Sequence, residues 1–293
     1  MLAQAELSDK DKCFVLSQLA VYGLDNFADY YEQWFDRFTH SGIKHFAQKK
    51  QQEWLAVQAI PQLRAVLTDK TLTRQLLDLS TPYFERGSVQ PEKLLIVFTT
   101  MYNNFYLSNP VFLAFIRALG VSVLILKDNS VYNYLNGIPG FGDSFDEAAS
   151  ALTTLIKKEQ IEKTYITGFS SGGYASLLMS TRIACDGYLG FSIGSDVSAN
   201  SQLPVSKFFT PDVVKDIDDN VKLDLAAVFK AKPYPYKCKI IYGAHTNIDA
   251  PHAENLNGID GFEVCKLADA GHITLAPLLI RNELLAQFEV LIT

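Results

Sequence analysis

From residue 91 to the end of the chain, short strand-like segments alternate with segments of helix length. The strand candidates occupy residues 94–99, 122–127, 164–167, 188–193, 238–242 and 262–267. Amphipathic helix candidates lie between most of them, at residues 110–119, 145–158, 174–184 and 251–257, and a last candidate covers 275–290. Parallel strands need a crossover connection, so this alternation predicts a mostly parallel sheet with helices on both faces. We therefore expect an α/β domain over residues 91–293.

Residues 1–90 show a different pattern, which predicts a helical N-terminal region. Apolar residues recur every three to four positions between residues 8 and 83. The turn-forming stretch 87–91, Gly-Ser-Val-Gln-Pro, marks the expected domain boundary. Residues 22–45 are dense in Tyr, Trp and Phe, which either bind a ligand or pack the helices together. If these aromatic helices are exposed, they would form a self-association face for a homo-oligomer.

Composition and charge narrow the expected partners. The 293 residues are 48% hydrophobic, enough for a large core, and carry a net charge of −6. No Lys/Arg cluster is interleaved with aromatic residues, so we expect no nucleic-acid partner. The N-terminus lacks a basic start followed by an apolar core, and no apolar run approaches the roughly 20 residues that span a bilayer. The sequence therefore predicts a cytoplasmic protein without a membrane span.

The sequence also lacks the motifs of metal, redox and phosphate sites. Its four cysteines include no C-x-x-C pair, and its five histidines include no H-E-x-x-H spacing. Neither a G-x-x-x-x-G-K-[ST] loop nor a G-x-G-x-x-G turn after a strand is present. We expect no metal and no cofactor.

Ser170 stands in Gly-Phe-Ser-Ser-Gly, residues 168–172, between the strand candidate 164–167 and the helix candidate 174–184. This is the G-x-S-x-G pattern of a nucleophile elbow. A serine hydroxyl is a poor nucleophile at neutral pH, so it needs an exposed tight turn, a base and amides that hold an oxyanion. The context predicts that Ser170 is the nucleophile.

A second copy of the pattern surrounds Ser192 in Gly-Phe-Ser-Ile-Gly, residues 190–194. The pattern alone does not decide between the two serines. Ser192 is followed by the polar, loop-like residues 194–204 and not by a helix candidate. We interpret Ser192 as a strand-end residue.

Two loops after later strand candidates supply partners for Ser170, because chemistry gathers at the carboxyl ends of parallel strands. His272 lies in the loop 268–274, next to a glycine, and is the candidate general base. Asp249 is the only carboxylate between the strand candidate 238–242 and the next helix, and it is the candidate acid that orients His272. Asp249 precedes Ala-Pro and would equally serve as a helix N-cap. Asp269 is the nearest rival acid.

The order Ser170, Asp249, His272, each after a successive strand of a parallel sheet, resembles the α/β-hydrolase superfamily. The resemblance covers residues 91–293. The first two antiparallel strands of that fold are not evident, so the resemblance implies an α/β-hydrolase fold trimmed of its first strands.

The same resemblance implies an oxyanion hole made of two backbone amides. One is the amide after the nucleophile, which is Ser171 here. The other comes from the loop 99–104, where Thr100 or Met101 would supply it. This loop departs from the H-G-G-G type of many lipases, so the sequence leaves both residues open.

Two long segments are candidates for the pocket walls. Residues 128–142 form either a substrate wall or a structural loop whose tyrosines cover the sheet edge. Residues 205–232 are inserted where the superfamily often carries a cap. His245 and His252 flank Asp249 and are expected to be surface or supporting residues.

These observations predict a serine hydrolase that cleaves a small carboxylic ester or thioester through an acyl-Ser170 intermediate. The same triad would suit an acyltransferase, because only the acceptor in the second half-reaction differs. A further alternative is a non-catalytic α/β-hydrolase scaffold that acts as a binding or interaction module.

Overall fold

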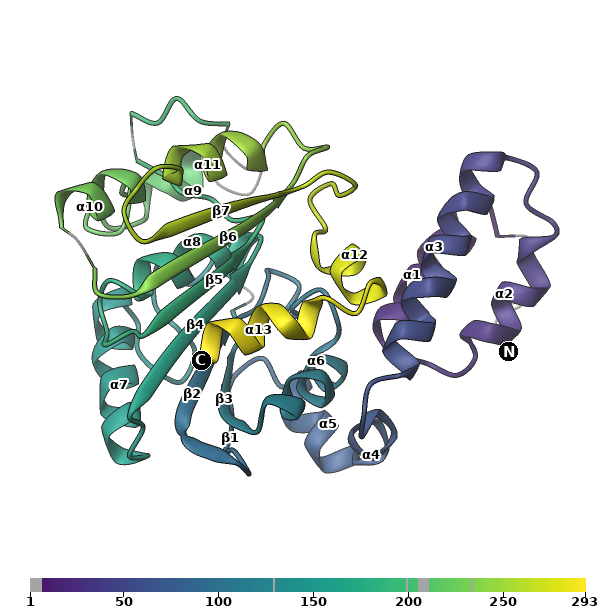
Figure 1. Ribbon diagram of the computed structural model, residues 1–293, viewed down its shortest axis with the longest axis horizontal. Coiled ribbons are helices and arrows are strands. Elements are labelled where there is room, and N and C mark those ends of the chain that lie inside the picture. Colours follow the sequence, from purple (N-terminus) through teal and green to yellow (C-terminus); the bar gives the residue numbers. More distant parts are fainter. Residues whose placement is uncertain (1–6, 129, 199, 205–210, 233) are drawn as a thin grey trace.

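In the computed structural model, seven strands form one sheet in the order β1-β3-β2-β4-β5-β6-β7 (Figure 1). The structure describes residues 7–128, 130–198, 200–204, 211–232 and 234–293. The strands are β1 (Tyr83–Glu85), β2 (Gln90–Phe98), β3 (Val121–Leu126), β4 (Lys163–Phe169), β5 (Gly187–Phe191), β6 (Lys237–Gly243) and β7 (Phe262–Leu267). Every pairing is parallel except that of β1 with β3. The predicted mostly parallel sheet is confirmed.

Helices cover both faces of the sheet. One face carries α7 (Phe145–Lys158), α8 (Ser171–Met179), α10 (Leu225–Ala231) and α11 (Asp249–Leu256) (Figure 1). The other carries α4 (Leu63–Thr68), α5 (Lys70–Leu77), α6 (Asn109–Ile116), α12 (Leu275–Ile280) and α13 (Leu284–Ile292). Leu94, Ile96 and Phe98 of β2 enter the first core, while Leu95 and Val97 enter the second. This alternation follows from the period of two in a strand and explains why both faces of β2 are apolar.

The expected last helix, residues 275–290, is two helices. α12 ends at Ile280 and α13 begins at Leu284, and Asn282 between them has a positive φ of 57°. A continuous apolar pattern did not reveal this turn. Strand β1 was likewise not predicted, since three residues are too short to show a period.

The N-terminal helices α1 (Asp9–Val21), α2 (Phe27–Phe35) and α3 (Ser41–Gln58) project beside the sheet and pack on one another (Figure 1). Their small core contains Leu16, Phe27, Trp34 and Phe38. Rings stack inside it, with the centroids of Phe27 and Trp54 5.2 Å apart. Of the two readings of the aromatic stretch 22–45, the structure favours helix packing.

The remaining helical elements are short. A 3-10 helix (Arg117–Leu119) follows α6, and α9 covers Pro211–Lys215. Among the described residues, no helix is both long enough and apolar enough to cross a bilayer.

Tyr134 anchors the long loop that follows β3. Its side chain is 1% exposed, and its hydroxyl lies 3.1 Å from the carbonyl oxygen of Thr99 and 3.0 Å from that of Leu126. The side chain of Thr99 is a third neighbour of the hydroxyl, at 2.9 Å. Tyr134 thereby ties residues 128–142 to the ends of β2 and β3, which agrees with the structural reading of this loop.

Replacing Tyr134 with phenylalanine is expected to lower the free energy of unfolding by about 1–3 kcal/mol, because buried acceptors lose their donor. Urea unfolding of Tyr134→Phe and of the half-buried control Tyr132→Phe would measure the difference. Equal stabilities for the two variants would contradict an anchoring role for the Tyr134 hydroxyl.

Candidate active site

Ser170 occupies a strained turn between β4 and α8. Its φ and ψ are 54° and −121°, a region that costs a non-glycine residue about 1–3 kcal/mol. The turn is held by the Ser170 amide, which donates to the carbonyl oxygen of Phe191 at 3.0 Å. A Cβ on Gly172 would lie 2.3 Å from the carbonyl oxygen of Thr99, so only glycine allows α8 to approach β2 this closely. A strained, partly exposed serine on a tight turn is the geometry that a nucleophile elbow requires.

Ser170, His272 and Asp249 form a continuous line of hydrogen bonds. Ser170 Oγ lies 2.7 Å from His272 Nε2, and His272 Nδ1 lies 2.8 Å from Asp249 Oδ2 and 3.0 Å from Oδ1. The carboxylate can only accept, so Nδ1 carries the proton and Nε2 is free to accept from the serine hydroxyl. The arrangement can therefore move a proton from Ser170 to His272 while Asp249 holds the ring.

The loop that carries His272 packs closely against the end of β6. A Cβ on Gly243 would lie 2.0 Å from the carbonyl oxygen of Gly271. Two backbone segments meet there because neither has a side chain in the way. This contact places His272 opposite β4 and Ser170.

Asp249 is the first residue of α11, and its side chain is 4% exposed. The N-cap position belongs to Ile248, and no side-chain cap bond is formed there. The Asp249 carboxylate points to His272 and does not cap the helix. The rival acid Asp269 instead pairs with Arg281, at 2.7 Å.

The two candidates for the second oxyanion donor differ in the structure. The amide of Thr100 donates to the carbonyl oxygen of Asn104 at 2.8 Å, inside a turn. The amide of Met101 donates to Ser171 Oγ at 2.7 Å and therefore faces the elbow. Of the two candidates, Met101 is therefore the one whose amide faces Ser171, the residue after Ser170.

Ser192 has a conformation similar to that of Ser170, with a φ of 47°. It follows β5, the neighbour of β4, so the two serines lie on adjacent strand ends. Its hydroxyl is buried and has no hydrogen-bond partner among the described residues, whereas His272 bonds Ser170. The hydrogen-bonded base thus distinguishes the two copies of the sequence motif.

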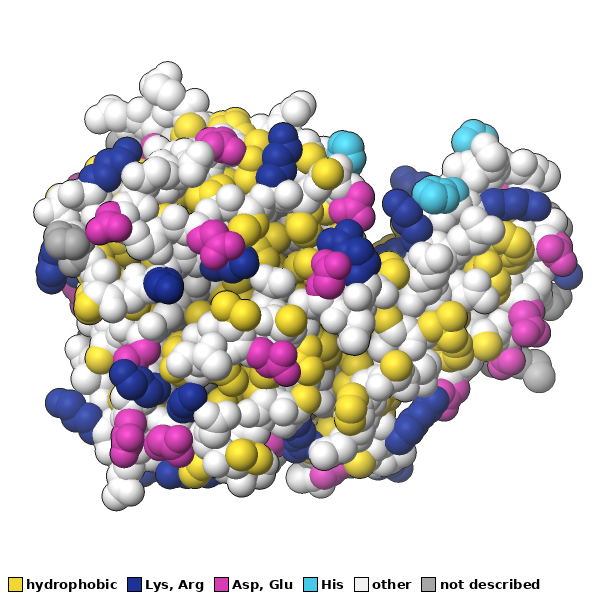
Figure 2. Space-filling view, in the orientation of Figure 1, with side chains coloured by type: hydrophobic (Ala, Val, Ile, Leu, Met, Phe, Trp, Pro, Cys, Tyr) yellow, Lys and Arg dark blue, Asp and Glu magenta, His cyan; other side chains and the backbone are white. Residues whose placement is uncertain are grey.

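A cavity of about 880 Å³ opens over the triad, between the carboxyl ends of the strands and the helices α1 and α3. In Figure 2 the molecule narrows where these helices join the rest. Ser17, Gln18 and Val21 of α1 and Phe46 and Lys50 of α3 line the cavity. No sequence pattern predicted these wall residues. The four-residue spacing of Phe46 and Lys50 indicates a shared helix face, but not what that face meets.

The described residues of the two segments expected to form the pocket walls lie elsewhere. None of the described residues of 128–142 or 205–232 lines this cavity. Residues 205–210 of the expected cap are outside the described residues. Val221, Leu225 and Phe229 pack into the core on the face of α7 and α8.

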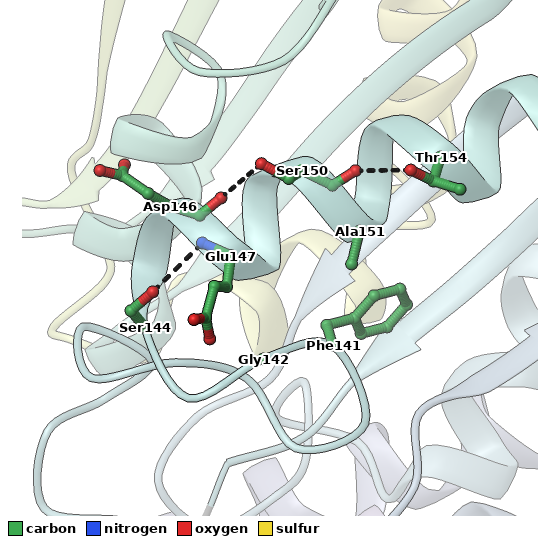
Figure 3. A pocket seen from close by; sticks show the side chains of 8 residues that line it. All are labelled: Phe141, Gly142, Ser144, Asp146, Glu147, Ser150, Ala151 and Thr154. Carbon is green, nitrogen blue, oxygen red and sulfur yellow. Dashed lines mark hydrogen bonds between the residues drawn. The ribbon is translucent and has the colours of Figure 1, made fainter.

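A second hollow, of about 570 Å³, lies along α7 (Figure 3) and shares no described lining residue with the cavity that contains Ser170. Its hydroxyl groups serve the helix itself. Ser144 accepts from the amide of Glu147, and Ser150 and Thr154 donate to carbonyl oxygens one turn back. Among the described residues, no group of three His, Cys, Asp or Glu side chains could hold a metal ion.

His252 is buried beside the cavity and is held between two backbone groups. Its Nδ1 accepts from the amide of Ser195 at 3.1 Å, so Nε2 carries the proton and donates to the carbonyl oxygen of Pro204 at 3.0 Å. Burial lowers the pKa of His252 below its ordinary 6.5, partly opposed by the bond to Pro204. The structure therefore holds this imidazole neutral.

We expect the protein to lose stability as the pH falls below about 6.5, because the unfolded chain then binds a proton that folded His252 resists. The contribution of neutral His252 to stability is fully present above the pKa of histidine in the unfolded chain. It is lost as the pH falls from that value toward the lower pKa of His252 in the folded protein. His252→Asn keeps an acceptor for the Ser195 amide without the titration. Its free energy of unfolding should change less between pH 7 and about pH 5 than that of the exposed control His245→Asn. Identical pH profiles would contradict the expectation.

Solved structures share this fold, although no protein-family model and no curated protein matches the sequence. The 2,6-dihydroxy-pseudo-oxynicotine hydrolase aligns over 99% of this chain and 90% of its own, with a TM-score of 0.54 and 13% identity. The bifunctional GH43-CE protein of Bacteroides eggerthii aligns over 72% of this chain, with a TM-score of 0.50 and 15% identity. The alignment covers 32% of that second protein, so this chain corresponds to about a third of it. Similarity at this level concerns the fold.

Proposed function

We propose that this chain, which has the α/β-hydrolase fold, is a hydrolase that cleaves a small carboxylic ester or thioester through an acyl-Ser170 intermediate. The observation that carries the proposal is the unbroken line from Ser170 Oγ through His272 to Asp249, at the wall of an 880 Å³ cavity. A hydroxyl in a strained turn, an imidazole within hydrogen-bond distance of it and a buried carboxylate behind the imidazole are the groups that acyl transfer needs. The names of the two structural neighbours, a hydrolase and a GH43-CE protein, agree with this class.

In the proposed reaction, Ser170 Oγ attacks the substrate carbonyl carbon while its proton passes to His272 Nε2. The carbonyl oxygen becomes an oxyanion, which the amides of Ser171 and Met101 would bind. The bond to the leaving group then breaks, and His272 returns the proton to the departing alcohol or thiol. Water attacks the acyl-serine by the same route, releases the carboxylic acid and restores Ser170. Asp249 stabilises the imidazolium in both steps.

The Met101 amide has to exchange partners during this cycle. At rest it donates to Ser171 Oγ at 2.7 Å. Rotation of the Ser171 side chain would release the amide for the oxyanion, since a hydroxyl bound to a sp³ carbon has alternative staggered positions. The oxyanion would therefore replace Ser171 Oγ as the acceptor.

We infer a division of tasks between residues 1–90 and residues 91–293. The triad and both oxyanion amides belong to the second part, while α1 and α3 of the first part supply one wall of the cavity. The N-terminal region would thus select the substrate, and the α/β domain would perform the chemistry.

Labelling with a fluorophosphonate tests the proposal, because this reagent bonds to an activated serine. Intact mass spectrometry should show one adduct on the wild type and on Ser192→Ala, and none on Ser170→Ala. The labelled protein should also lose hydrolysis of a panel of nitrophenyl esters and thioesters. A folded wild type that forms no adduct and cleaves no ester of the panel would overturn the proposed function.

A further inference from the structure

Lys50 and Glu53 form an ion pair in the wall of the cavity, and the hydroxyl of Tyr106 is hydrogen-bonded to both. Lys50 Nζ is 2.7 Å from Glu53 Oε2 and 3.1 Å from the hydroxyl of Tyr106. The Tyr106 hydroxyl donates to Glu53 Oε1 at 2.5 Å. Glu53 is 1% exposed and Tyr106 is 8% exposed. The proposed triad uses none of these groups.

Stability alone does not account for this arrangement. A buried ion pair pays a desolvation penalty that its attraction often fails to repay, so apolar residues would stabilise the fold at least as well. Tyr106 also has a φ of 66°, which is unfavourable for an aromatic residue. A buried ion pair beside a strained residue in a cavity wall is the kind of feature that clusters at functional sites.

Within the described part of the chain, hydrogen bonds engage two of the three N–H donors of Lys50. An ammonium group has three N–H donors, and Lys50 directs two of them to Glu53 and Tyr106. Lys50 and Tyr106 line the cavity, whereas Glu53 is not among the lining residues and stands behind them. Glu53 and Tyr106 together hold the ammonium in one position, which lowers the entropy cost of a further hydrogen bond. The third N–H is available to a molecule in the cavity.

Lys50 is also the only Lys or Arg among the described lining residues of this cavity. The rings of Phe46 and Tyr106 lie beside it, each with its centroid 5.6 Å from Nζ. A single oriented cation between apolar surfaces discriminates strongly for an oxygen acceptor, because an apolar group placed there would leave the donor unpaired.

We propose that the substrate of this site carries a second oxygen acceptor, a carbonyl or a carboxylate, apart from the scissile ester, and that Lys50 Nζ binds it. This inference rests on the proposed function and names a substrate class for it. Helix α3 would thus recognise one end of the substrate while Ser170 attacks the other.

Matched esters test the proposal. We would compare 4-nitrophenyl hexanoate, 5-oxohexanoate and hydrogen adipate, whose acyl chains have six carbons and differ at the far end. Acetate esters of alcohols with the same three endings would test the other side of the scissile bond. In at least one series, the wild type should have a higher kcat/KM for an oxygen-bearing ester than for the apolar one, chiefly through KM.

Three variants separate the role of the charge from damage to the fold. Lys50→Met with Glu53→Gln removes both charges and should reduce the preference for the oxygen-bearing ester about 10-fold or more. Glu53→Gln alone leaves the Lys50 charge uncompensated and should increase the preference for adipate over the ketone. Lys49→Met, the same substitution at the exposed neighbour, should keep the wild-type preference.

The same compounds titrated into Ser170→Ala by calorimetry report binding without hydrolysis. A tighter Kd for the oxygen-bearing esters that is lost in the double Lys50/Glu53 variant would support the proposal even if the wild type hydrolysed none of them. Equal preferences in the wild type and the double variant, in both series and in the titrations, would overturn it while leaving ester hydrolysis intact.

Discussion

Ser170→Ala is expected to reduce kcat/KM for the best ester by about 10⁴-fold or more, because it removes the atom that forms the acyl intermediate. His272→Ala should cause a loss of similar size, because without a neighbouring base the Ser170 hydroxyl keeps its proton. The double variant should be no slower than either single variant, because the two residues act as one unit. Steady-state kinetics on purified protein would measure all three.

Ser192→Ala is the matched control, because it removes a hydroxyl from the adjacent strand end with a similar backbone conformation. Its kcat/KM should be within about 10-fold of the wild-type value. Ser192→Ala as inactive as Ser170→Ala, with both proteins folded by circular dichroism, would contradict the assignment of Ser170. The assignment would also be contradicted if the losses of kcat/KM caused by Ser170→Ala and His272→Ala were additive in the double variant.

Asp249→Asn is expected to reduce kcat by about 10⁴-fold while leaving the fold intact. The amide of asparagine can donate to His272 Nδ1, which would shift the ring proton to Nε2 and remove the acceptor for Ser170. The hydrogen bonds of 2.8 and 3.0 Å make Nδ1 the only ring nitrogen that faces this carboxylate. Steady-state kinetics over a range of pH would measure the loss of kcat, and thermal unfolding would show whether the fold is intact.

Asp269→Asn serves as the control for this experiment. Asp269 lies three residues before His272 and bonds the partly exposed Arg281, so its loss should leave kcat unchanged. Equal losses of kcat for the two variants would show that a carboxylate near His272 acts only through its negative charge and not through a specific hydrogen bond. A near-normal rate for Asp249→Asn would exclude Asp249 as the orienting acid.

Much of the fold could be predicted because its signals are local. The strands β2 to β7 were all found, since each is a short apolar run between turn or helix signals. The site candidates followed from topology, because parallel strands bring their carboxyl ends to one edge. Ser170, Asp249 and His272, separated by as many as 102 positions, meet within hydrogen-bond distance at that edge.

Other features depended on contacts that no local pattern encodes. We propose Met101 and not Thr100 as the second oxyanion donor because the Thr100 amide is already bonded to Asn104 inside the 99–104 turn, whereas the Met101 amide faces Ser171. Strand β1 exists because β3 offers an open edge, and three residues have too little pattern to be recognised. The expected pocket wall 128–142 is instead tied to the sheet ends by Tyr134.

Periodicity, glycine positions and chain order are properties of the chain, and they were enough to predict the mostly parallel sheet, the tight turn at Ser170 and the order of the candidate triad. What covers these residues depends on contacts between distant segments. Lys50 and Glu53 are ordinary helix-surface residues by spacing, and only the packing of α3 beside Tyr106, 53 positions beyond Glu53, buries the pair in the cavity wall. The substrate selection proposed for Lys50 depends on such long-range packing, because a helix pattern shows which residues share a face but not which surface that face meets.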